Sequence, residues 1–428
     1  MVHRRQFLAG LGAAVAAPVL SAFQPPAGGV GRLKIAAVEV WKLEGTRQAE
    51  TGVNQQYQVN PLHVYDELRP EPYHDSAAPG TRTVATSALY LKIKTDQGLE
   101  ALYGPIDREV AIVVIERLRP FLIGKDPLAG EALWDQMYRS NRHSRAGLFL
   151  MAISAVDNTL WDLRGRFFNA PVYRLLGGPT RSSVEAYASC LGYSLEPEAM
   201  HKRAQQFKAD GFRYEKWFMA YGPGDGPEGL RKNVEMVRTL RDAVGDDVEL
   251  MFDAYSGWDL TYALEWARQV EKYRPRWIEE AFHPEKIESF AALRRAISFP
   301  VASGEHFYGR WEVERYLAAG ALNVVQADPE WCGGVSELVK ICAVSSLHDA
   351  EVIPHGHSIH AALHVIASQS PMTCPLAEYL VLKMSSYYHF EKDPPRVEHA
   401  RLALPMRPGF GIELDPAKVE RTSQLKLE

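Results

Sequence analysis

Two hydrophobic patterns follow one another along the chain. Between about residues 31 and 105, short runs such as KIAAVEVWKL and SALYLKIKTDQGLEALYG alternate apolar and polar positions, and this period of two predicts strands. Residues 108–168 instead repeat apolar side chains at helical spacing, as Ile153, Val156 and Leu160 do. The first part of the chain is therefore expected to form a small α+β domain.

A regular alternation of short apolar strands and amphipathic helices begins near residue 184. The predicted strands are SVEAYASCLG, FRYEKWFMA, DVELMFDAY, RWIEEAF, FPVASGEH, LNVVQADP, AEVIPHGH and CPLAEYLV. Helical segments such as EGLRKNVEMVRTLRDAVG and TYALEWARQVEKY lie between them. Strands joined by helical crossovers in this way predict a parallel (β/α)8-type barrel.

The patterns divide the chain into an α+β domain over residues 31–165 and a barrel over residues 166–389. Residues 390–428 contain another strand-like run, GFGIELD, among Pro and Gly residues. We expect this last segment to return to the first domain and complete it.

The first thirty residues differ in character from the rest of the chain. HRRQFLAGLGAAVAAPVLSAF places Arg4 and Arg5 before a short run of small apolar residues. This arrangement predicts a twin-arginine export signal over residues 1–30 and a periplasmic protein, the alternative being a disordered apolar N-terminus. The run is too short to span a bilayer, and no later segment is typical of a transmembrane helix.

The charge of the chain argues against a nucleic-acid partner. The net charge of −5 and the pI of about 6.3 give no basic field that would hold a nucleic-acid backbone, so we expect a small-molecule partner. The four cysteines lack the CxxC spacing of a zinc or redox site: Cys190, Cys332, Cys342 and Cys374. Buried free thiols are expected, although export leaves a disulfide possible.

Carboxylates end three consecutive barrel strands. Asp253 ends ELMFD, Glu279 ends RWIE and Glu305 ends VASGE, each 26 residues after the one before, which is one βα unit. The C-terminal ends of barrel strands converge, so these groups should meet and repel one another unless a cation lies between them. An all-oxygen ligand set suits Mg²⁺.

The next strands continue this series. Asp328 ends NVVQAD, His355 ends EVIPH one unit later, and Glu378 ends CPLAE. An aspartate beside a histidine fixes the tautomer of the ring and raises its basicity, so His355 is the candidate base.

Three further histidines follow His355 in IPHGHSIHAALH. His360 and His364 have the i, i+4 spacing of a zinc site, but the segment between them holds no glutamate that could act as a base. We expect both to be ordinary polar or partly buried residues of the helix after the seventh strand. Whether His357 faces the site stays open.

Together these residues resemble the enolase superfamily, mandelate racemase subgroup, as do AVDNTLWDLRGRFFNAPVYRLLGG, WIEEAF and SGEH. The resemblance implies an α+β capping domain and a (β/α)7β modified TIM barrel. It also implies one Mg²⁺ on the three carboxylates, an Asp–His dyad, and a glutamate that stabilises the intermediate. The residues that carry these roles are Asp253, Glu279, Glu305, Asp328, His355 and Glu378.

Within the subgroup, DAYSGWD, GEHF and PHGHS look most like rhamnonate-dehydratase-type acid-sugar dehydratases. The implied reaction removes the proton next to a carboxylate, forms an enediolate and expels a β-hydroxyl, giving a 2-keto-3-deoxy acid. A racemase, epimerase or cycloisomerase would use the same enediolate chemistry. Relatives often assemble, so a homo-oligomer is expected.

One departure from the subgroup favours elimination. Relatives often end the second barrel strand with Lys-x-Lys, whereas this chain has Lys216-Trp217-Phe218. The second lysine serves relatives as the base on the opposite face, and Phe218 accepts no proton. Lys216 remains to orient the substrate carboxylate or a metal ligand.

Four residues are candidates for substrate contacts. Tyr255 follows Asp253 closely, and His306 follows Glu305 directly. His63 and Arg82, from the predicted capping segment, could bind hydroxyls or a distal carboxylate, or could equally be surface residues.

Two rival functions were weighed against this one. GDGPEG, residues 224–229, has the G-x-G-x-x-G spacing of a dinucleotide site, but Asp225 and Glu228 would repel a pyrophosphate and Pro227 removes a backbone donor. We expect an extended loop at the barrel mouth instead. The other rival is a non-catalytic binding protein that keeps the fold and the metal.

Overall fold

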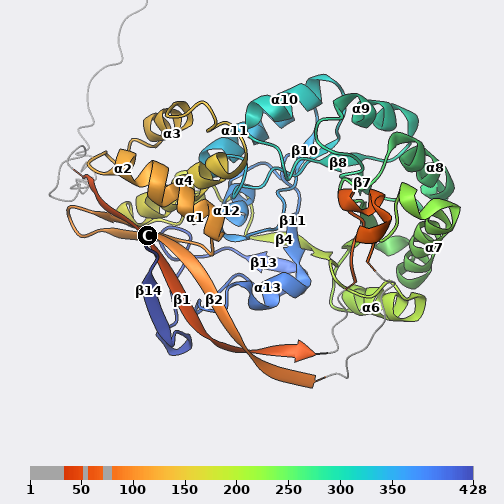
Figure 1. Ribbon diagram of the computed structural model, residues 1–428, viewed down its shortest axis with the longest axis horizontal. Coiled ribbons are helices and arrows are strands. Elements are labelled where there is room, and N and C mark those ends of the chain that lie inside the picture. Colours follow the sequence, from red (N-terminus) through yellow and green to blue (C-terminus); the bar gives the residue numbers. More distant parts are fainter. Residues whose placement is uncertain (1–32, 52–55, 71–79, 428) are drawn as a thin grey trace, which may run out of the picture.

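The computed structural model describes residues 33–51, 56–70 and 80–427. The predicted export signal, residues 1–30, lies outside these residues. Figure 1 shows an α+β domain on the left and a ring of helices around the barrel on the right. Among the described residues, no helix is long and apolar enough to cross a membrane.

The capping domain is built on an antiparallel sheet with the strand order β14–β1–β2–β3. Its strands are β1 (Ile35–Thr51), β2 (Gly80–Thr95), β3 (Glu100–Tyr103) and β14 (Arg421–Gln424). Its helices are α1 (Arg108–Val113), α2 (Arg119–Leu122), α3 (Gly130–Arg139) and α4 (Gly147–Phe167), with a π-helical segment η3 (Val114–Leu118) and the 3₁₀ turns η1 (Pro61–Val64) and η2 (Asp66–Leu68). Helix α4 packs against β2 and β3 and also contacts helix α11 of the barrel domain.

The barrel has the (β/α)7β arrangement, which confirms the predicted fold class. Its strands are β4 (Ser183–Ser189), β5 (Tyr214–Phe218), β6 (Glu249–Asp253), β7 (Trp277–Glu279), β8 (Val301–Ser303), β9 (Val324–Val325), β10 (Glu351–Val352) and β11 (Ala377–Leu380). The helices between them are α6 (Pro197–Ala209), α7 (Gly226–Val244), α8 (Leu260–Val270), α9 (Ile287–Ala296), α10 (Arg310–Ala318), α11 (Val335–Ser346) and α12 (His360–Ser368), with α5 (Val172–Leu175) before the barrel and α13 (Val381–Tyr387) after it. The last strand, β11, pairs in parallel with the first, β4.

The C-terminal segment differs in part from the expectation. The strand that joins the capping sheet is β14, which pairs with β1, whereas GFGIELD forms two isolated bridges, between Gly409 and Pro171 and between Leu414 and Glu391. Gly409 and Gly411 both have positive φ, which interrupts an extended strand there. Earlier in the same segment, the hairpin β12 (Val397–Glu398) and β13 (Arg401–Ala403) pairs with barrel strand β4.

The segment GDGPEG begins a helix and is not the extended loop we expected. Gly224 and Asp225 lie in the 3₁₀ turn η4 (Pro223–Asp225), and α7 starts at Gly226. The carboxylate of Asp225 accepts a hydrogen bond from the backbone N–H of Gly222 at 2.8 Å. Pro227 lies in the first turn of α7, where its missing N–H leaves no intrahelical bond unmade.

The barrel interior explains why the strand-end residues converge. Seven buried apolar side chains fill the centre of the barrel: Tyr187, Met251, Trp277, Ala302, Val324, Ile353 and Leu376. Side chains two residues apart on a strand point the same way. Asp253, Glu279, His355 and Glu378 each follow one of these apolar residues by two positions, so they stand directly above this layer.

All four cysteines are buried free thiols. The Sγ atoms of Cys342 and Cys374 lie 3.6 Å apart, in contact but not joined by a disulfide.

The burial of the Glu215 carboxyl in the barrel can be tested by its effect on stability. Glu215 lies on β5, fully buried, with one carboxylate oxygen accepting from Trp217 Nε1 at 3.0 Å and the other without a partner among the described residues. Burial raises the pKa of Glu215 to about 8, against an opposing contribution from Trp217. A raised carboxyl pKa means that the folded state holds a proton which the unfolded state releases, so stability falls as pH rises from the unfolded pKa to the folded one.

We therefore expect Glu215→Gln to match the wild type below about pH 4, where the carboxyl is protonated in both states, and to exceed its free energy of unfolding by about 2–4 kcal/mol near pH 8.5. Urea unfolding at several pH values measures this difference. Glu235→Gln is the control, since Glu235 lies half-exposed on α7 in a surface ion pair with Arg238. An equal pH dependence in both variants would contradict the assignment.

Candidate active site

Three carboxylates meet at the C-terminal ends of the barrel strands. Asp253 and Glu279 are in register at the ends of β6 and β7, and Glu305 follows β8 by two residues. All three are buried, and their ligand oxygens lie within 4.8 Å of one another. The structure thus brings the three predicted metal ligands together.

Lys216 lies among these carboxylates. Its Nζ is 2.5 Å from Glu279 Oε1, 3.2 Å from Asp253 Oδ2 and 2.8 Å from Glu378 Oε1. Burial alone would lower the pKa of this ammonium, but the charges of Glu279 and Glu378 outweigh it and raise that pKa well above its usual range. Lys216 therefore contacts two of the predicted metal ligands as well as Glu378, and its side chain is buried rather than open to a substrate.

The site fits a divalent cation on its own geometry. Burial raises the pKa of Glu279 to about 8, with Lys216 opposing and Asp253 adding to the effect. Carboxylates with raised pKa values at one point are stabilised in their charged form when a cation binds between them. Trp277 Nε1 donates to Glu279 Oε2 at 2.9 Å, which holds the second oxygen of that carboxylate.

A second group of potential ligands shares Glu305. Glu280 and His306 each offer an atom within 4.8 Å of it. Glu280 is buried with positive φ, and burial together with the charge of Glu305 raises its pKa well above the usual range. His306 Nε2 lies 3.3 Å from Glu305 Oε1, and its ring stacks on Trp331.

The predicted dyad is assembled as expected from the strand-end pattern. His355 Nδ1 donates to Asp328 Oδ2 at 2.8 Å, and Asp328 is fully buried. This bond leaves His355 Nε2 free, at 3.7 Å from Glu305 Oε2. Burial would lower the pKa of His355, but Glu305 and the hydrogen bond with Asp328 raise it to about 9.

Glu378 completes the ring of charged groups. One oxygen contacts Lys216, and the other accepts from the backbone N–H of Gly356 at 2.8 Å. Burial would raise the pKa of Glu378, but Lys216 and His355 lower it to about 2. Glu378 is therefore an anion over the whole physiological pH range.

The other three histidines have structural partners. His360 Nε2 contacts the carboxylate of Glu391 at 2.9 Å, and His364 Nδ1 accepts from the backbone N–H of Tyr173 at 3.0 Å. Both lie in α12, as expected, but they are fully rather than partly buried, because α12 packs against α5 and the His364 ring contacts Phe410 of the C-terminal segment.

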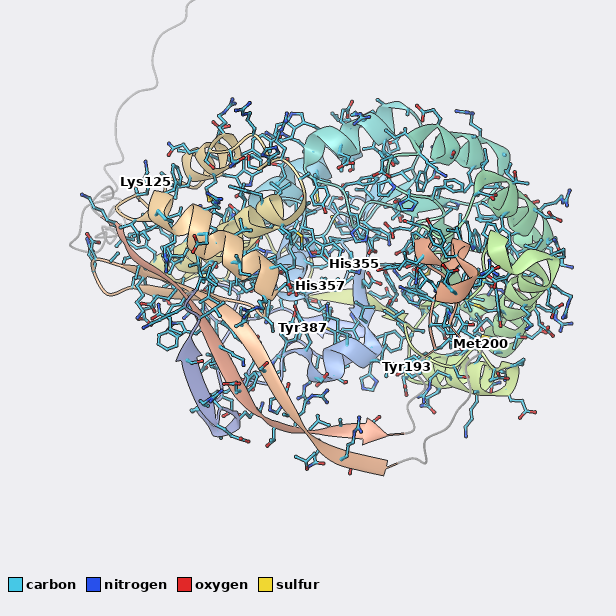
Figure 2. The ribbon with its side chains drawn as sticks, viewed as in Figure 1. Lys125, Tyr193, Met200, His355, His357 and Tyr387 are labelled. Atoms are coloured by element: carbon cyan, nitrogen blue, oxygen red, sulfur yellow. The ribbon has the colours of Figure 1, made fainter. Side chains whose placement is uncertain are left out.

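His357 lies beside the dyad, and Figure 2 shows it with His355 and Tyr387 between the two domains. Its Nδ1 is 2.8 Å from Lys383 Nζ, which only donates, so the His357 ring is neutral with its proton on Nε2. That Nε2 lies 3.3 Å from Tyr387 Oη.

The capping segment contributes differently from the two candidate residues. The backbone N–H of Val59 donates to Met219 O at 2.7 Å, so this segment docks on the C-terminal end of β5. His63, in η1, contacts Asn60 Nδ2 at 3.1 Å and is half-buried. Arg82 is exposed on β2 opposite Ala49, and no described hydrogen bond brings it to the carboxylate cluster.

Tyr255 lies next to the predicted metal ligand Asp253. Its backbone N–H donates to Asp253 Oδ1 at 2.9 Å, and its side chain is 36% exposed. Positive φ at a tyrosine is uncommon, and here it turns the chain sharply after β6.

The sequence reasoning missed Trp331 and Lys383. The Trp331 ring centroid lies about 5 Å from those of His306, His355 and His357, so this side chain packs against all three rings. Its position three residues after Asp328 was the available signal. Lys383 comes from α13, after the last strand, and no pattern in the sequence connects it with His357.

The chain matches two described families. Residues 62–177 match the N-terminal domain of the mandelate racemase / muconate lactonizing enzyme family, and residues 199–418 match the enolase C-terminal domain-like family.

Individual relatives agree with these matches. An L-rhamnonate dehydratase from Saccharopolyspora erythraea is 32% identical over 379 residues, covering 86% of this chain and 92% of the relative. The rhamnonate dehydratase from Gibberella zeae complexed with Mg has a TM-score of 0.75 at 28% identity, covering 90% of this chain and 95% of that one. The 3,6-anhydro-D-galactonate cycloisomerase from Zobellia galactanivorans has a TM-score of 0.71 at 26% identity, covering 91% and 100%. With the carboxylate cluster, these similarities identify Mg²⁺ as the cofactor.

Removing one ligand charge tests the metal site. We expect Glu279→Gln to weaken Mg²⁺ binding about tenfold or more, because a neutral amide replaces one of three carboxylates. Titration calorimetry measures the affinity, and circular dichroism checks that the fold is kept.

Glu280→Gln is the matched control, one residue away and equally buried. If Glu279→Gln binds Mg²⁺ as the wild type does while Glu280→Gln does not, the ligand set is the one that contains Glu280 and His306.

Proposed function

Because the chain belongs to the mandelate racemase / muconate lactonizing enzyme family of the enolase superfamily, we propose that it is an Mg²⁺-dependent dehydratase of an aldonate or aldarate. The reaction removes the proton next to the carboxylate and the hydroxyl one carbon further on. The product is a 2-keto-3-deoxy acid, and the enzyme is a carbon–oxygen lyase.

The observation that carries the proposal is the single base on one side of the site. His355 has a free Nε2 and a carboxylate partner on Nδ1. Phe218, at the end of β5, offers no proton acceptor, and the Lys216 ammonium is held by three carboxylates. One base suffices for elimination, whereas a mandelate-type racemase needs a second base on the other face.

Removal of the α-proton needs a base and a positive charge close to the substrate carboxylate. His355 Nε2 takes the α-proton, and the carboxylate of Asp328 stabilises the imidazolium that forms. Asp253, Glu279 and Glu305 would hold Mg²⁺, whose positive charge would stabilise the negative charge that develops on the substrate carboxylate.

The second half of the reaction uses the same histidine. The electron pair left by the α-proton forms the new C–C double bond as the C–O bond to the β-hydroxyl breaks. Protonated His355 returns its proton to the leaving hydroxyl, which departs as water, and the enol product then tautomerises to the keto acid. No outside oxidant or reductant is required.

A cycloisomerase is the second candidate, because the cycloisomerase structure named above has a similar fold. It would begin with the same proton removal by His355, but the reaction would open or close a ring instead of expelling the β-hydroxyl as water. The two candidates differ in product, so the identity of the product separates them.

A panel of acid sugars, including L-rhamnonate, tests the proposal when each is incubated with Mg²⁺ in D₂O and followed by NMR. We expect a 2-keto-3-deoxy acid and no accumulation of a C2 epimer. In His355→Asn, dehydration and α-proton exchange should fall by about 10²-fold or more, because no second base remains.

His348→Asn, a surface histidine paired with Glu314, is the control for a histidine substitution. A deuterated C2 epimer, or exchange that survives in His355→Asn, would move the function to a racemase or epimerase, with Lys216 the first suspect. A ring-closed or ring-opened isomer with no loss of water would favour the cycloisomerase.

Asp328→Asn tests the partner of the base. The carboxylate raises the pKa of His355, so its loss should shift the rising limb of kcat/KM against pH to lower pH, with lower activity at the plateau. An unshifted limb would mean that Asp328 does not set the basicity of His355.

A further inference from the structure

The loop that carries Asp328 is held by the capping domain. Trp134 of α3 donates from Nε1 to Gly333 O at 2.7 Å, and the Gly333 N–H donates to Ser154 Oγ of α4 at 2.9 Å. Asn158, also on α4, donates to Pro329 O at 3.1 Å. In Figure 1, α3 and α4 lie next to α11, which this loop enters. The position of the loop is therefore set from outside the barrel.

The contact nearest to the dyad is made by Glu330. Tyr103, the last residue of capping strand β3, is fully buried and donates from its hydroxyl to Glu330 Oε1. Glu330 itself is 8% exposed. This is a bond between side chains of the two domains, with neither group open to water, so its loss leaves a buried polar atom without its partner.

Glu330 is in turn bonded to the aspartate of the dyad. Its backbone N–H donates to Asp328 Oδ1 at 2.6 Å, while Asp328 Oδ2 accepts from His355 Nδ1. Each oxygen of Asp328 thus has one donor, and the donor on the far side from His355 belongs to Glu330. A rotation of the Glu330 backbone would turn the carboxylate away from the ring.

We propose that Glu330 is a positioning residue for the Asp328–His355 dyad, and that Tyr103 of the capping domain holds it in place. The capping domain then contributes to the orientation of the base as well as to the walls of the site. This inference rests on the proposed role of His355, and neither Glu330 nor Tyr103 touches the reacting atoms.

The chain provides a matched control for the loss of the tyrosine hydroxyl. Tyr90 is on the neighbouring capping strand β2, is also fully buried, and also donates to a buried glutamate, Glu391, at 3.1 Å. Glu391 makes no described bond to the loop of Asp328. Tyr90→Phe therefore removes the same kind of bond between elements without touching the dyad.

The first measurement needs no substrate. The hydrogen-bonded Nδ1 proton of His355 should give a low-field resonance in ¹⁵N-histidine-labelled protein, assigned by its loss in His355→Asn. We expect Tyr103→Phe and Glu330→Ala to shift or broaden this resonance, and Tyr90→Phe and Glu330→Gln to leave it unchanged. Glu330→Gln keeps both an acceptor for Tyr103 and the backbone N–H.

The second measurement is kinetic, with whichever acid sugar the panel identifies. Tyr103→Phe and Glu330→Ala should each lower kcat about tenfold with little change in KM or in Mg²⁺ affinity, since they disturb only the base. The double variant should lose no more than either single one, because the two residues act as a unit.

The two measurements separate the possible failures. If no acid sugar reacts but the resonance moves as expected, the positioning role stands and the proposed function falls. If Tyr103→Phe and Glu330→Ala change the resonance and kcat no more than the control Tyr90→Phe does, the pair is only a contact between domains. The inference is then overturned. Tyr103→Phe alone decides the question if Glu330→Ala does not fold.

Discussion

Like charges buried at one point are the constraint on which the rest of this structure depends. Five carboxylates, Asp253, Glu279, Glu280, Glu305 and Glu378, are buried at the mouth of the barrel, and Lys216 is the one lysine or arginine that forms ion pairs with them among the described residues. Burial is the main cause of the raised pKa values of Glu279 and Glu280, and repulsion from the neighbouring carboxylates adds to it. A divalent cation reverses this cost, so the same repulsion that destabilises the metal-free site favours metal binding.

The scaffold keeps these groups from moving apart. Four of the strand-end residues stand two positions above a side chain of the packed layer inside the barrel, such as Trp277 under Glu279 or Met251 under Asp253. Relaxing the repulsion by displacement would therefore disturb a close-packed core, which is costly. The capping domain adds a second support on the other side through α4 and β3, so the aspartate of the dyad is held from both domains.

Hydrophobic periodicity and residue spacing were enough to predict every barrel strand and the convergence of the carboxylates. The spacing of 26 residues between Asp253, Glu279 and Glu305 is enough, because one βα unit fixes the height of each strand end. Arg82 and His63 were harder to place: Arg82 lies on the exposed part of strand β2, and His63 lies in the 3₁₀ turn η1, whose position follows no hydrophobic period. GFGIELD has a strand-like composition, but two glycines with positive φ decide otherwise. The hydrogen bond between Tyr103 and Glu330 joins residues that are 227 positions apart, and no pattern in either segment predicts this contact.

The position of Lys216 connects the electrostatics with the direction of the chemistry. An ammonium that balances three carboxylates is kept protonated by them, so it cannot accept a proton from a substrate at ordinary pH. The place that a second base would occupy at the end of β5 is filled by the ring of Phe218, whose centroid lies 5.1 Å from Lys216 Nζ. In the proposed mechanism, Lys216 and Phe218 therefore leave proton transfer to one face only. A site with one basic face can complete an elimination by returning its proton to the leaving group, but it cannot invert the carbon that it deprotonates.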